Sequence, residues 1–229
     1  MPHPRHDPGA RHPGPENLVS AARTAGVTDE RLLGALRVTP RSAFVPASCR
    51  ASAYADVPVA IDHGQVTTQP SLVAMMVAAL GLTGDERVLE IGSGYGFQTA
   101  LLARLAGYVV GVERYADMAE QARTHLAGQG IRNAEIVVGD GTLGAAERGP
   151  FDAIVVSAAF PEVPPPLAAQ LRAGGRLVQP IGPGGQERVE LYEKTDRGLV
   201  CQRTVAFAHF VRLYGEYGCP PAAPFHDTG

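Results

Sequence analysis

Apolar residues recur every three or four positions in the first third of this chain, which is the period of an amphipathic helix. Two short helices are predicted between residues 17 and 40, from the stretches NLVSAARTAG and DERLLGALRV. In the second stretch Leu32, Leu33 and Leu36 share one face, and Pro40 ends the helix. A third helix is predicted over residues 71–82, because Pro70 suits a first helical turn.

After residue 82 the pattern changes to short apolar runs that alternate with helical segments. Strands are predicted at 87–91, 108–113, 134–140, 151–158 and 176–182, and helices at 97–106, 116–128 and 165–173, with a Gly-Gly turn before the last strand. This alternation indicates an α/β fold with a doubly wound, mainly parallel sheet of the Rossmann-like type. After Gly182 the helices stop, and residues 187–194, 199–206 and 208–215 are predicted as antiparallel strands at the C-terminal edge.

The same pattern divides the chain into four regions. Residues 1–16 and 220–229 hold little that could be buried, which predicts two flexible tails. Residues 17–82 are expected to form an N-terminal helical segment, and residues 83–219 the α/β core. The histidines of the first tail are explained by its biased composition better than by a metal site, so we expect no metal there: His3, His6 and His12.

The charge and cysteine content exclude several classes of protein. With 20 basic and 23 acidic residues the formal net charge is -3, which gives no electrostatic footprint for nucleic acid or an anionic membrane. Cys49, Cys201 and Cys219 are odd in number and form no CxxC pattern, so no disulfide framework or thiolate zinc site is indicated. The N-terminus lacks the apolar core of a secretion signal, and the apolar run at 72–82 is too short to span a bilayer. We therefore expect a cytoplasmic protein. We also expect a monomer, which is an assumption separate from these observations.

A glycine-rich loop follows the first predicted strand of the core. Residues 90–96 have the spacing E-x-G-x-G-x-G and lie between a strand and a helix, at the sheet edge where doubly wound folds bind ligands. Glu113 ends the next strand, where a carboxylate can accept hydrogen bonds from ribose hydroxyls. Asp140 ends the third strand, where we expect it to meet an adenine amino group. Three such features at successive strand ends predict a site for a nucleoside cofactor.

These motifs, with the upstream stretch GQVTTQP, resemble the protein-L-isoaspartate O-methyltransferase family over roughly residues 17–215. The matching stretches are GQVTTQP, VLEIGSGYGFQTALLA, VER, GDG, FDAIVVSAA and GGRLVQPIG, in the order of the family. The resemblance implies S-adenosylmethionine as cofactor and isoaspartyl peptides and proteins as substrates, methylated for protein repair. It also implies a cofactor site formed by Gln65, Val66, Thr67, Thr68, Glu90, Gly92, Ser93, Gly94, Gly96, Gln98, Glu113, Arg114, Gly139, Asp140 and Gly141.

The family's reaction is the attack of an isoaspartyl α-carboxylate on the methyl group of the cofactor. A carboxylate with a pKa of about 4 is already ionised at neutral pH, so the enzyme needs no general base and has mainly to position its substrate. Thr68 is the candidate catalytic residue, because its hydroxyl can orient the carboxylate. Thr67, Gln69, Ser157, Ala158 and Ala159 are the candidate substrate contacts. The alternative for Thr68 is that its hydroxyl satisfies free N–H groups at the start of the following helix.

The chain departs from the family's pattern at three positions. Thr68 stands where the family usually has serine, and its extra methyl group is stiff and bulky beside the reaction centre. Tyr95 stands where a small residue is typical, and Arg212 where proline is common. Arg212 either contacts an acidic peptide or is solvated, and His63 either lines the site or has a surface or packing role.

Several functional hypotheses are compatible with these residues. The first is broad repair, and the second is methylation of one dedicated peptide in natural-product maturation. Dedicated relatives often carry a long extra C-terminal segment, whereas this sequence ends soon after the core, so we expect repair. The third is a protein that binds S-adenosylmethionine without turnover. A nicotinamide dehydrogenase is disfavoured, because the third glycine of G-x-G-x-x-G would fall at Phe97 and Lys194 is the only lysine.

Overall fold

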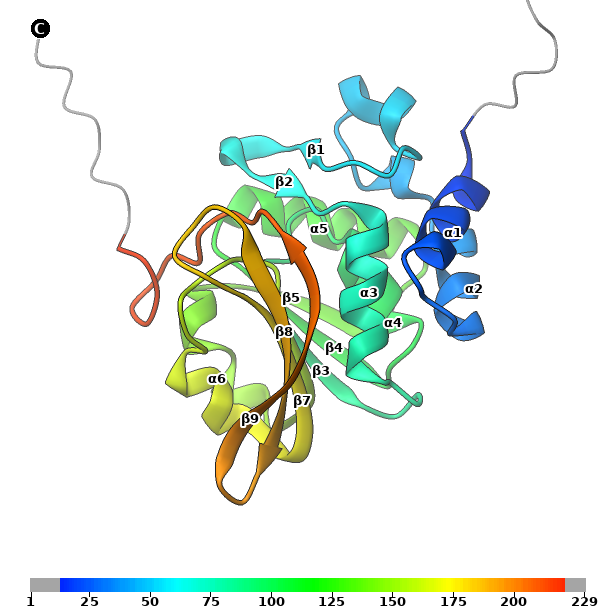
Figure 1. The fold of residues 1–229 in the computed structure, drawn as a ribbon. Helices are drawn as coiled ribbons and strands as arrows, with labels where there is room; N and C mark the ends of the chain where they lie inside the picture. Colours follow the sequence, from blue (N-terminus) through cyan, green and yellow to red (C-terminus); the bar gives the residue numbers. More distant parts are fainter. Residues whose placement is uncertain (1–12, 221–229) are drawn as a thin grey trace, which may run out of the picture.

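The computed structural model describes residues 13–220, so most of each expected tail, with His3, His6 and His12, lies outside the described residues. Its centre is a seven-stranded sheet with the order β5-β4-β3-β6-β7-β8-β9 (Figure 1). The strands are β3 (Arg87–Ile91), β4 (Tyr108–Glu113), β5 (Ala134–Val138), β6 (Phe151–Val156), β7 (Leu171–Ile181), β8 (Glu187–Thr195) and β9 (Gly198–Ala208). Strands β3 to β7 pair in parallel, whereas β8 and β9 are antiparallel additions at one edge. The predicted fold class is confirmed.

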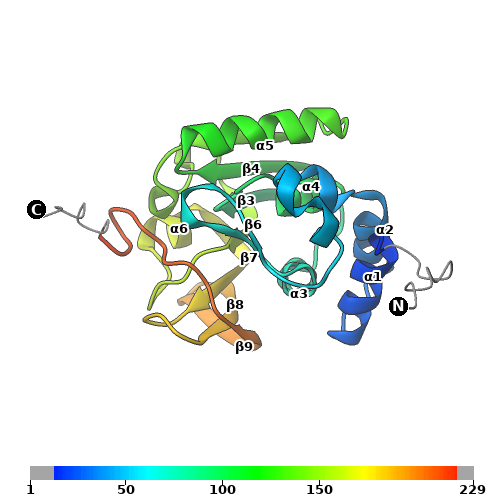
Figure 2. The same cartoon turned by 90° about the horizontal axis from the view of Figure 1, so that it is seen from above.

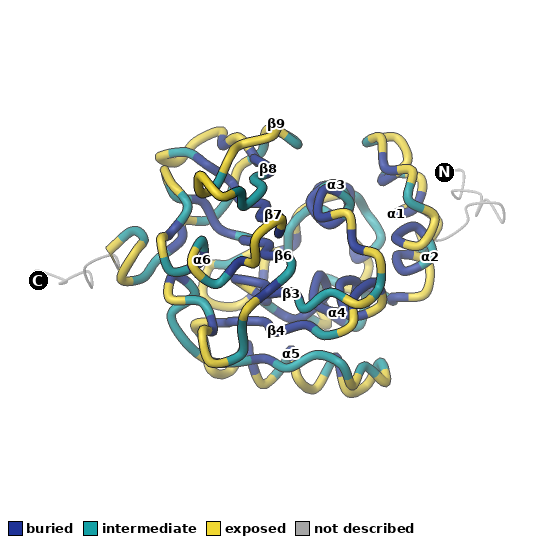
Figure 3. Tube along the Cα trace, turned by 90° about the horizontal axis from the view of Figure 1, so that it is seen from below, coloured by how far each residue is buried: buried dark blue, intermediate teal, exposed yellow. Residues whose placement is uncertain are grey.

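Helices cover both faces of the sheet. The helices α3 (Pro70–Leu80), α4 (Phe97–Ala103) and α5 (Ala116–Gly128) pack on one face, and α6 (Pro165–Gln170) on the other. The helices α1 (Pro15–Thr24) and α2 (Glu30–Val38) pack beside α3, away from the sheet (Figure 2). Helix α3 is therefore enclosed on all sides, and only Met75 and Ala78 of its residues are not fully buried (Figure 3). This enclosure explains why its sequence is apolar all round.

Two predicted elements at the C-terminal edge are wrong. Helix α6 ends at Gln170, and the Gly-Gly pair that was expected to form a turn lies inside the long strand β7. The pairing of β6 with β7 shifts its register there, and Gly174 adopts a φ of 75°. A side chain at Gly175 would come within 2.8 Å of the Asp152 carbonyl, so the close strand approach requires glycine.

The second correction concerns residues 208–215, which were expected to form a strand of the sheet. Between Ala208 and residue 220 the chain instead leaves β9 and forms only isolated bridges, Ala159 with Arg212 and Tyr214 with Cys219. The Ala159 N–H donates to the Val211 carbonyl at 2.8 Å, which holds this segment across the end of β6. The sheet therefore has one strand fewer than predicted, and this segment lies beside the end of β6 instead.

A small hairpin precedes α3 and was not predicted. Strands β1 (Val59–Ala60) and β2 (Val66–Thr67) pair antiparallel and carry the GQVTTQP segment over the carboxyl ends of the core strands (Figure 1). Two-residue strands are too short to give a period in the sequence. Within residues 13–220, no helix combines the length and apolar character needed to cross a membrane.

Candidate active site

A cavity opens at the carboxyl ends of β3, β4 and β6, between the hairpin and the C-terminal segment. Most of the candidate site residues line it, although they come from separate parts of the chain: Gln65, Val66, Thr67, Thr68, Glu90, Gly92, Ser93, Gly94, Gln98, Glu113, Arg114, Gly141, Ser157 and Ala158. Five candidates do not line it: Gln69, Gly96, Gly139, Asp140 and Ala159. The cavity is also lined by Arg212, and by residues that the sequence did not indicate: Tyr115, Met118, Val211, Leu213 and Tyr214.

The glycine loop presents its backbone to this cavity. Gly94 has a φ of 55°, a conformation that is costly for most side chains, and its N–H donates to Glu113 Oε2 at 2.9 Å. Gly96 faces α5 instead of the cavity, with Ala122 at ordinary contact distance from the position of a side chain, and its φ of 91° is what favours glycine there.

Glu113 is buried at the end of β4, with 5% of its surface exposed. Burial raises the pKa of its carboxyl, and the backbone N–H groups that it accepts from oppose that shift. Gly94 N donates to one oxygen and Tyr115 N to the other, at 2.9 and 3.1 Å. A carboxylate has about four acceptor positions. Glu113 therefore keeps acceptor capacity toward the cavity, as a pair of ribose hydroxyls requires.

Glu90 belongs to a second, fully buried polar group. Its carboxylate accepts from the Thr99 hydroxyl and from Gln98 Nε2, the latter at 3.0 Å, and burial raises its pKa to about 7. Gln98 Nε2 also donates to Ser157 Oγ at 3.0 Å. Two buried atoms of the cavity wall, Ser93 Oγ and Gln98 Oε1, have no hydrogen-bond partner within residues 13–220. Such atoms are unusual in folded proteins and mark positions where a ligand can bond.

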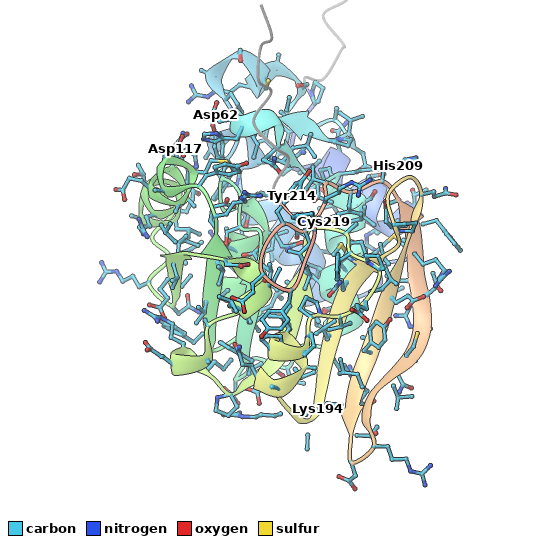
Figure 4. The ribbon with its side chains drawn as sticks, turned by 90° about the vertical axis from the view of Figure 1, so that its left-hand side faces the viewer. Asp62, Asp117, Lys194, His209, Tyr214 and Cys219 are labelled. Atoms are coloured by element: carbon cyan, nitrogen blue, oxygen red, sulfur yellow. The ribbon has the colours of Figure 1, made fainter. Side chains whose placement is uncertain are left out.

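The C-terminal segment closes one side of the cavity. The Arg114 guanidinium lies over the rings of Tyr115 and Tyr214, 5.0 and 5.1 Å from their centroids. Figure 4 shows Tyr214 close to Cys219, where the segment turns back on itself. This aromatic pair was missed, because nothing in the sequence indicates that Tyr214 returns to the end of β4.

Asp140 holds the C-terminal segment in place. One of its oxygens accepts from the Thr142 N–H and hydroxyl at 2.8 and 2.7 Å, and the other accepts from Glu216 N at 2.7 Å. A side chain at Gly215 would overlap Asp140 Oδ1 at 2.0 Å. The carboxylate that was expected to meet adenine thus accepts three hydrogen bonds within the protein and does not line the cavity, whereas the neighbouring Gly141 does.

Arg41 organises the segment that carries the two threonines, and sequence reasoning missed it. This side chain is fully buried, and burial lowers its pKa to about 10. Its guanidinium donates to three backbone carbonyls at 3.0 to 3.1 Å, those of Ala53, Ala55 and Val57. It also donates to Thr67 Oγ1 at 2.8 Å and to the Thr68 carbonyl at 3.4 Å. The guanidinium therefore joins two loops and sets the backbone position of Thr68.

The start of α3 does not depend on the Thr68 hydroxyl. Gln69 is the N-cap residue and makes no capping bond, whereas Asp56 Oδ1 accepts from the Ser71 N–H at 2.8 Å. Gln69 Nε2 donates to Asp56 Oδ2 at 2.9 Å. Asp56 thus serves the first turn that Thr68 was expected to serve in the alternative hypothesis. In the described part of the chain, no hydrogen bond joins the Thr68 hydroxyl to α3.

Tyr95 and His63 fasten the hairpin over the cofactor edge. The Tyr95 hydroxyl donates to Asp62 Oδ2 at 2.5 Å, and His63 Nε2 lies 2.8 Å from Asp117 Oδ2. The His63 ring also stacks on Tyr115 with 4.0 Å between centroids, although its backbone has an unusual φ of 56°. Figure 4 shows Asp62 and Asp117 together at this end of the molecule. The large side chain at position 95 thus ties the hairpin to the glycine loop.

Lys194 lies at the opposite end of the molecule from Asp62 and Asp117 (Figure 4). Its ammonium donates to the carbonyls of Ala168 and Leu171, at 2.8 and 2.6 Å, where α6 ends. The lone lysine of the chain is therefore a helix-terminus contact and takes no part in the cavity.

Comparison with known proteins agrees with this geometry. The family model of protein-L-isoaspartate(D-aspartate) O-methyltransferase matches residues 14–218. A protein-L-isoaspartate O-methyltransferase of Methanoculleus marisnigri is 47% identical over 203 residues, which cover 86% of this chain and 89% of the relative. One of Anaeromyxobacter dehalogenans is 52% identical over 165 residues, covering 72% and 79%. A solved protein-L-isoaspartate O-methyltransferase structure has a TM-score of 0.78 at 31% identity, covering 89% of this chain and 67% of that one. This chain belongs to the protein-L-isoaspartate(D-aspartate) O-methyltransferase family.

Proposed function

We propose that this chain transfers a methyl group from S-adenosylmethionine to the free α-carboxylate of isoaspartyl residues in damaged proteins, at the cavity described above. Membership of the family carries the activity and the cofactor. The observation that supports this site best is a junction of two cavities. The cavity at the glycine loop, which we call the glycine-loop cavity, and a second cavity share four lining residues: Val66, Thr68, Ser157 and Val211. Two hydroxyls therefore lie where a cofactor and a substrate can meet.

The glycine-loop cavity fits S-adenosylmethionine. Glu113 has acceptor capacity for ribose hydroxyls, and the unpartnered Ser93 Oγ and Gln98 Oε1 offer further polar contacts. The backbone of Gly92 and Gly94 allows close approach. When bound, the cofactor supplies a methyl group on a positively charged sulfur. We assign its binding to the cavity-lining residues, and to Asp140 only through the C-terminal segment that it anchors.

The second cavity is our proposed entrance for the substrate. It is bordered by Pro58, Val66, Thr68, Gln69, Leu72, Ser157, Gln186 and residues 207–211, none of which is a carboxylate, lysine or arginine. The incoming carboxylate is ionised at neutral pH, so proton abstraction is unnecessary. The role left to the protein is to hold the carboxylate in line with the methyl group and to exclude water. We propose that the Thr68 hydroxyl orients one carboxylate oxygen.

The proposed partners are isoaspartyl peptides and proteins, with the chain acting as a monomer and without nucleic acid or membrane. The test is methyl transfer from labelled S-adenosylmethionine to an isoaspartyl peptide and to its α-linked twin. We expect the isoaspartyl peptide to be labelled and the twin to be ignored. Equal labelling of both would refute the repair function, and labelling of one sequence among several isoaspartyl peptides would favour a dedicated substrate.

A further inference from the structure

Ser157 contributes a second hydroxyl to the junction, from the loop that follows β6. Like Thr68, it lines both cavities, but the two residues come from separate elements. What the Ser157 hydroxyl can do depends on where its proton points. The hydrogen bonds around Gln98 show on which side the Ser157 oxygen is an acceptor.

When Glu90 is ionised, the side-chain amide of Gln98 can face it in only one sense. The Glu90 carboxylate is fully buried, accepts from the Thr99 hydroxyl on one oxygen, and as a carboxylate can only accept. The Gln98 NH2 group must therefore face the other oxygen, at 3.0 Å. The same NH2 group lies 3.0 Å from Ser157 Oγ. Ser157 is thus the acceptor in that contact, and its own O–H is free to donate elsewhere.

We infer that Gln98 is a positioning residue, which acts through Ser157 by directing the Ser157 O–H toward the junction of the two cavities. There the hydroxyl holds the same oxygen of the isoaspartyl carboxylate that the Thr68 hydroxyl orients, and the other oxygen is left to attack. An oxygen whose lone pair is engaged by a donor is a poorer nucleophile, so the useful place for this donor is the oxygen that does not attack. The inference rests on the proposed function, because it assumes that the isoaspartyl carboxylate reaches the junction.

This role is consistent with the balance of the reaction. The attacking oxygen forms the new O–C bond while the carbon–sulfur bond breaks, and the electron pair of that bond stays on sulfur. No proton moves in this step. A hydroxyl whose oxygen is already occupied by Gln98 can therefore remain a donor throughout, without rearrangement of its hydrogen bonds.

The test measures binding of an isoaspartyl peptide at saturating S-adenosylhomocysteine by calorimetry, for Ser157→Ala, Gln98→Met and the double variant. We expect Ser157→Ala to weaken the peptide Kd about tenfold, as loss of a hydrogen bond to a charged group does. Gln98→Met should weaken it severalfold in the parent but not in the Ser157→Ala background, because its effect passes through Ser157. Ser157→Thr, which keeps the hydroxyl, should restore binding.

Gln179→Met is the matched control. Gln179 is also fully buried and donates to the Glu162 carbonyl at 2.9 Å, but it lines neither cavity. Equal losses from Gln98→Met in both backgrounds, or an unchanged peptide Kd in Ser157→Ala, would overturn the inference. A weakened S-adenosylhomocysteine Kd in Ser157→Ala would also overturn it, by making Ser157 a cofactor ligand. Peptide binding by the parent without methyl transfer would instead refute the proposed function. The effect of Gln98→Met on the peptide Kd could still be compared between the parent and the Ser157→Ala background.

Discussion

Arg41 offers the sharpest test of how the hairpin is held, because one side chain joins two loops. We consider Arg41→Lys, which keeps a positive charge and removes the planar fork of donors. The guanidinium serves five acceptors, of which four lie within 3.1 Å. A lysine ammonium has three donors on a shorter, compact head, so at least two acceptors lose their partner.

The magnitude follows from those lost partners. A buried acceptor left without a donor costs about 1 to 3 kcal/mol, so two of them give about 2 to 4 kcal/mol after some relaxation of the loops. For a domain of this size each kcal/mol corresponds to about 2 to 4 °C in Tm, so we expect a fall of about 4 to 16 °C. Because Thr67 and Thr68 lose their anchor, kcat should fall about tenfold, whereas S-adenosylhomocysteine affinity should change less than threefold.

Denaturant unfolding and steady-state kinetics of the same preparations would measure both effects. Arg31→Lys is the matched control. Arg31 also donates to two backbone carbonyls, those of Leu82 and Leu105, but it is exposed and lines neither cavity. We expect the control to lose less than about 1 kcal/mol. If Arg41→Lys changed the free energy of unfolding by less than about 0.5 kcal/mol, the claim that this guanidinium positions the threonines would be refuted.

Three further predictions concern the cavity. Thr68→Val should lower kcat about tenfold to a thousandfold in single-turnover assays with a nearly unchanged Tm, because Asp56 serves α3, and Thr68→Ser should remain active; a Val variant as fast as the parent would remove the catalytic assignment. Glu113→Ala should weaken cofactor affinity about tenfold or more by calorimetry, since charge-assisted bonds to ribose are lost; an unchanged Kd in the folded variant would exclude Glu113 from the site. Glu90 has a folded pKa raised from 4.5 to about 7, so the parent should lose up to about 3 kcal/mol of unfolding free energy between pH 4.5 and 8 through this group. Glu90→Gln should abolish that part of the pH dependence in denaturant unfolding. An identical pH dependence in parent and variant would contradict the claim that Glu90 ionises with a raised pKa in the folded protein.

The sequence alone determined the features that repeat locally. Strands β3, β4 and β6 were found because a strand buried on both faces is apolar at nearly every position, and α4 and α5 because helices between such strands keep their period. Strand β5 lies at the edge of the sheet, where only Ile136 is buried, and was found from its short apolar run. The glycine loop and Glu113 were found for a related reason. Parallel strands all end at one edge of the sheet, so residues that follow successive strands are brought together by topology before any side chain is placed.

The tertiary structure decided which partner each polar group takes. Asp140 has the strand-end position of a ligand, and it also accepts a hydrogen bond from Glu216 N and packs against Gly215, which the pattern of apolar residues had assigned to a strand of the sheet. Arg41 is charged, yet it is fully buried, because its two terminal nitrogens donate to three carbonyls of residues 53–57, to the Thr67 hydroxyl and to the Thr68 carbonyl. Only its Nε has no partner within residues 13–220. Periodicity records which side of an element meets the core. It carries no information on which donor, many residues away, docks against which acceptor, because that choice is fixed only when the loops pack.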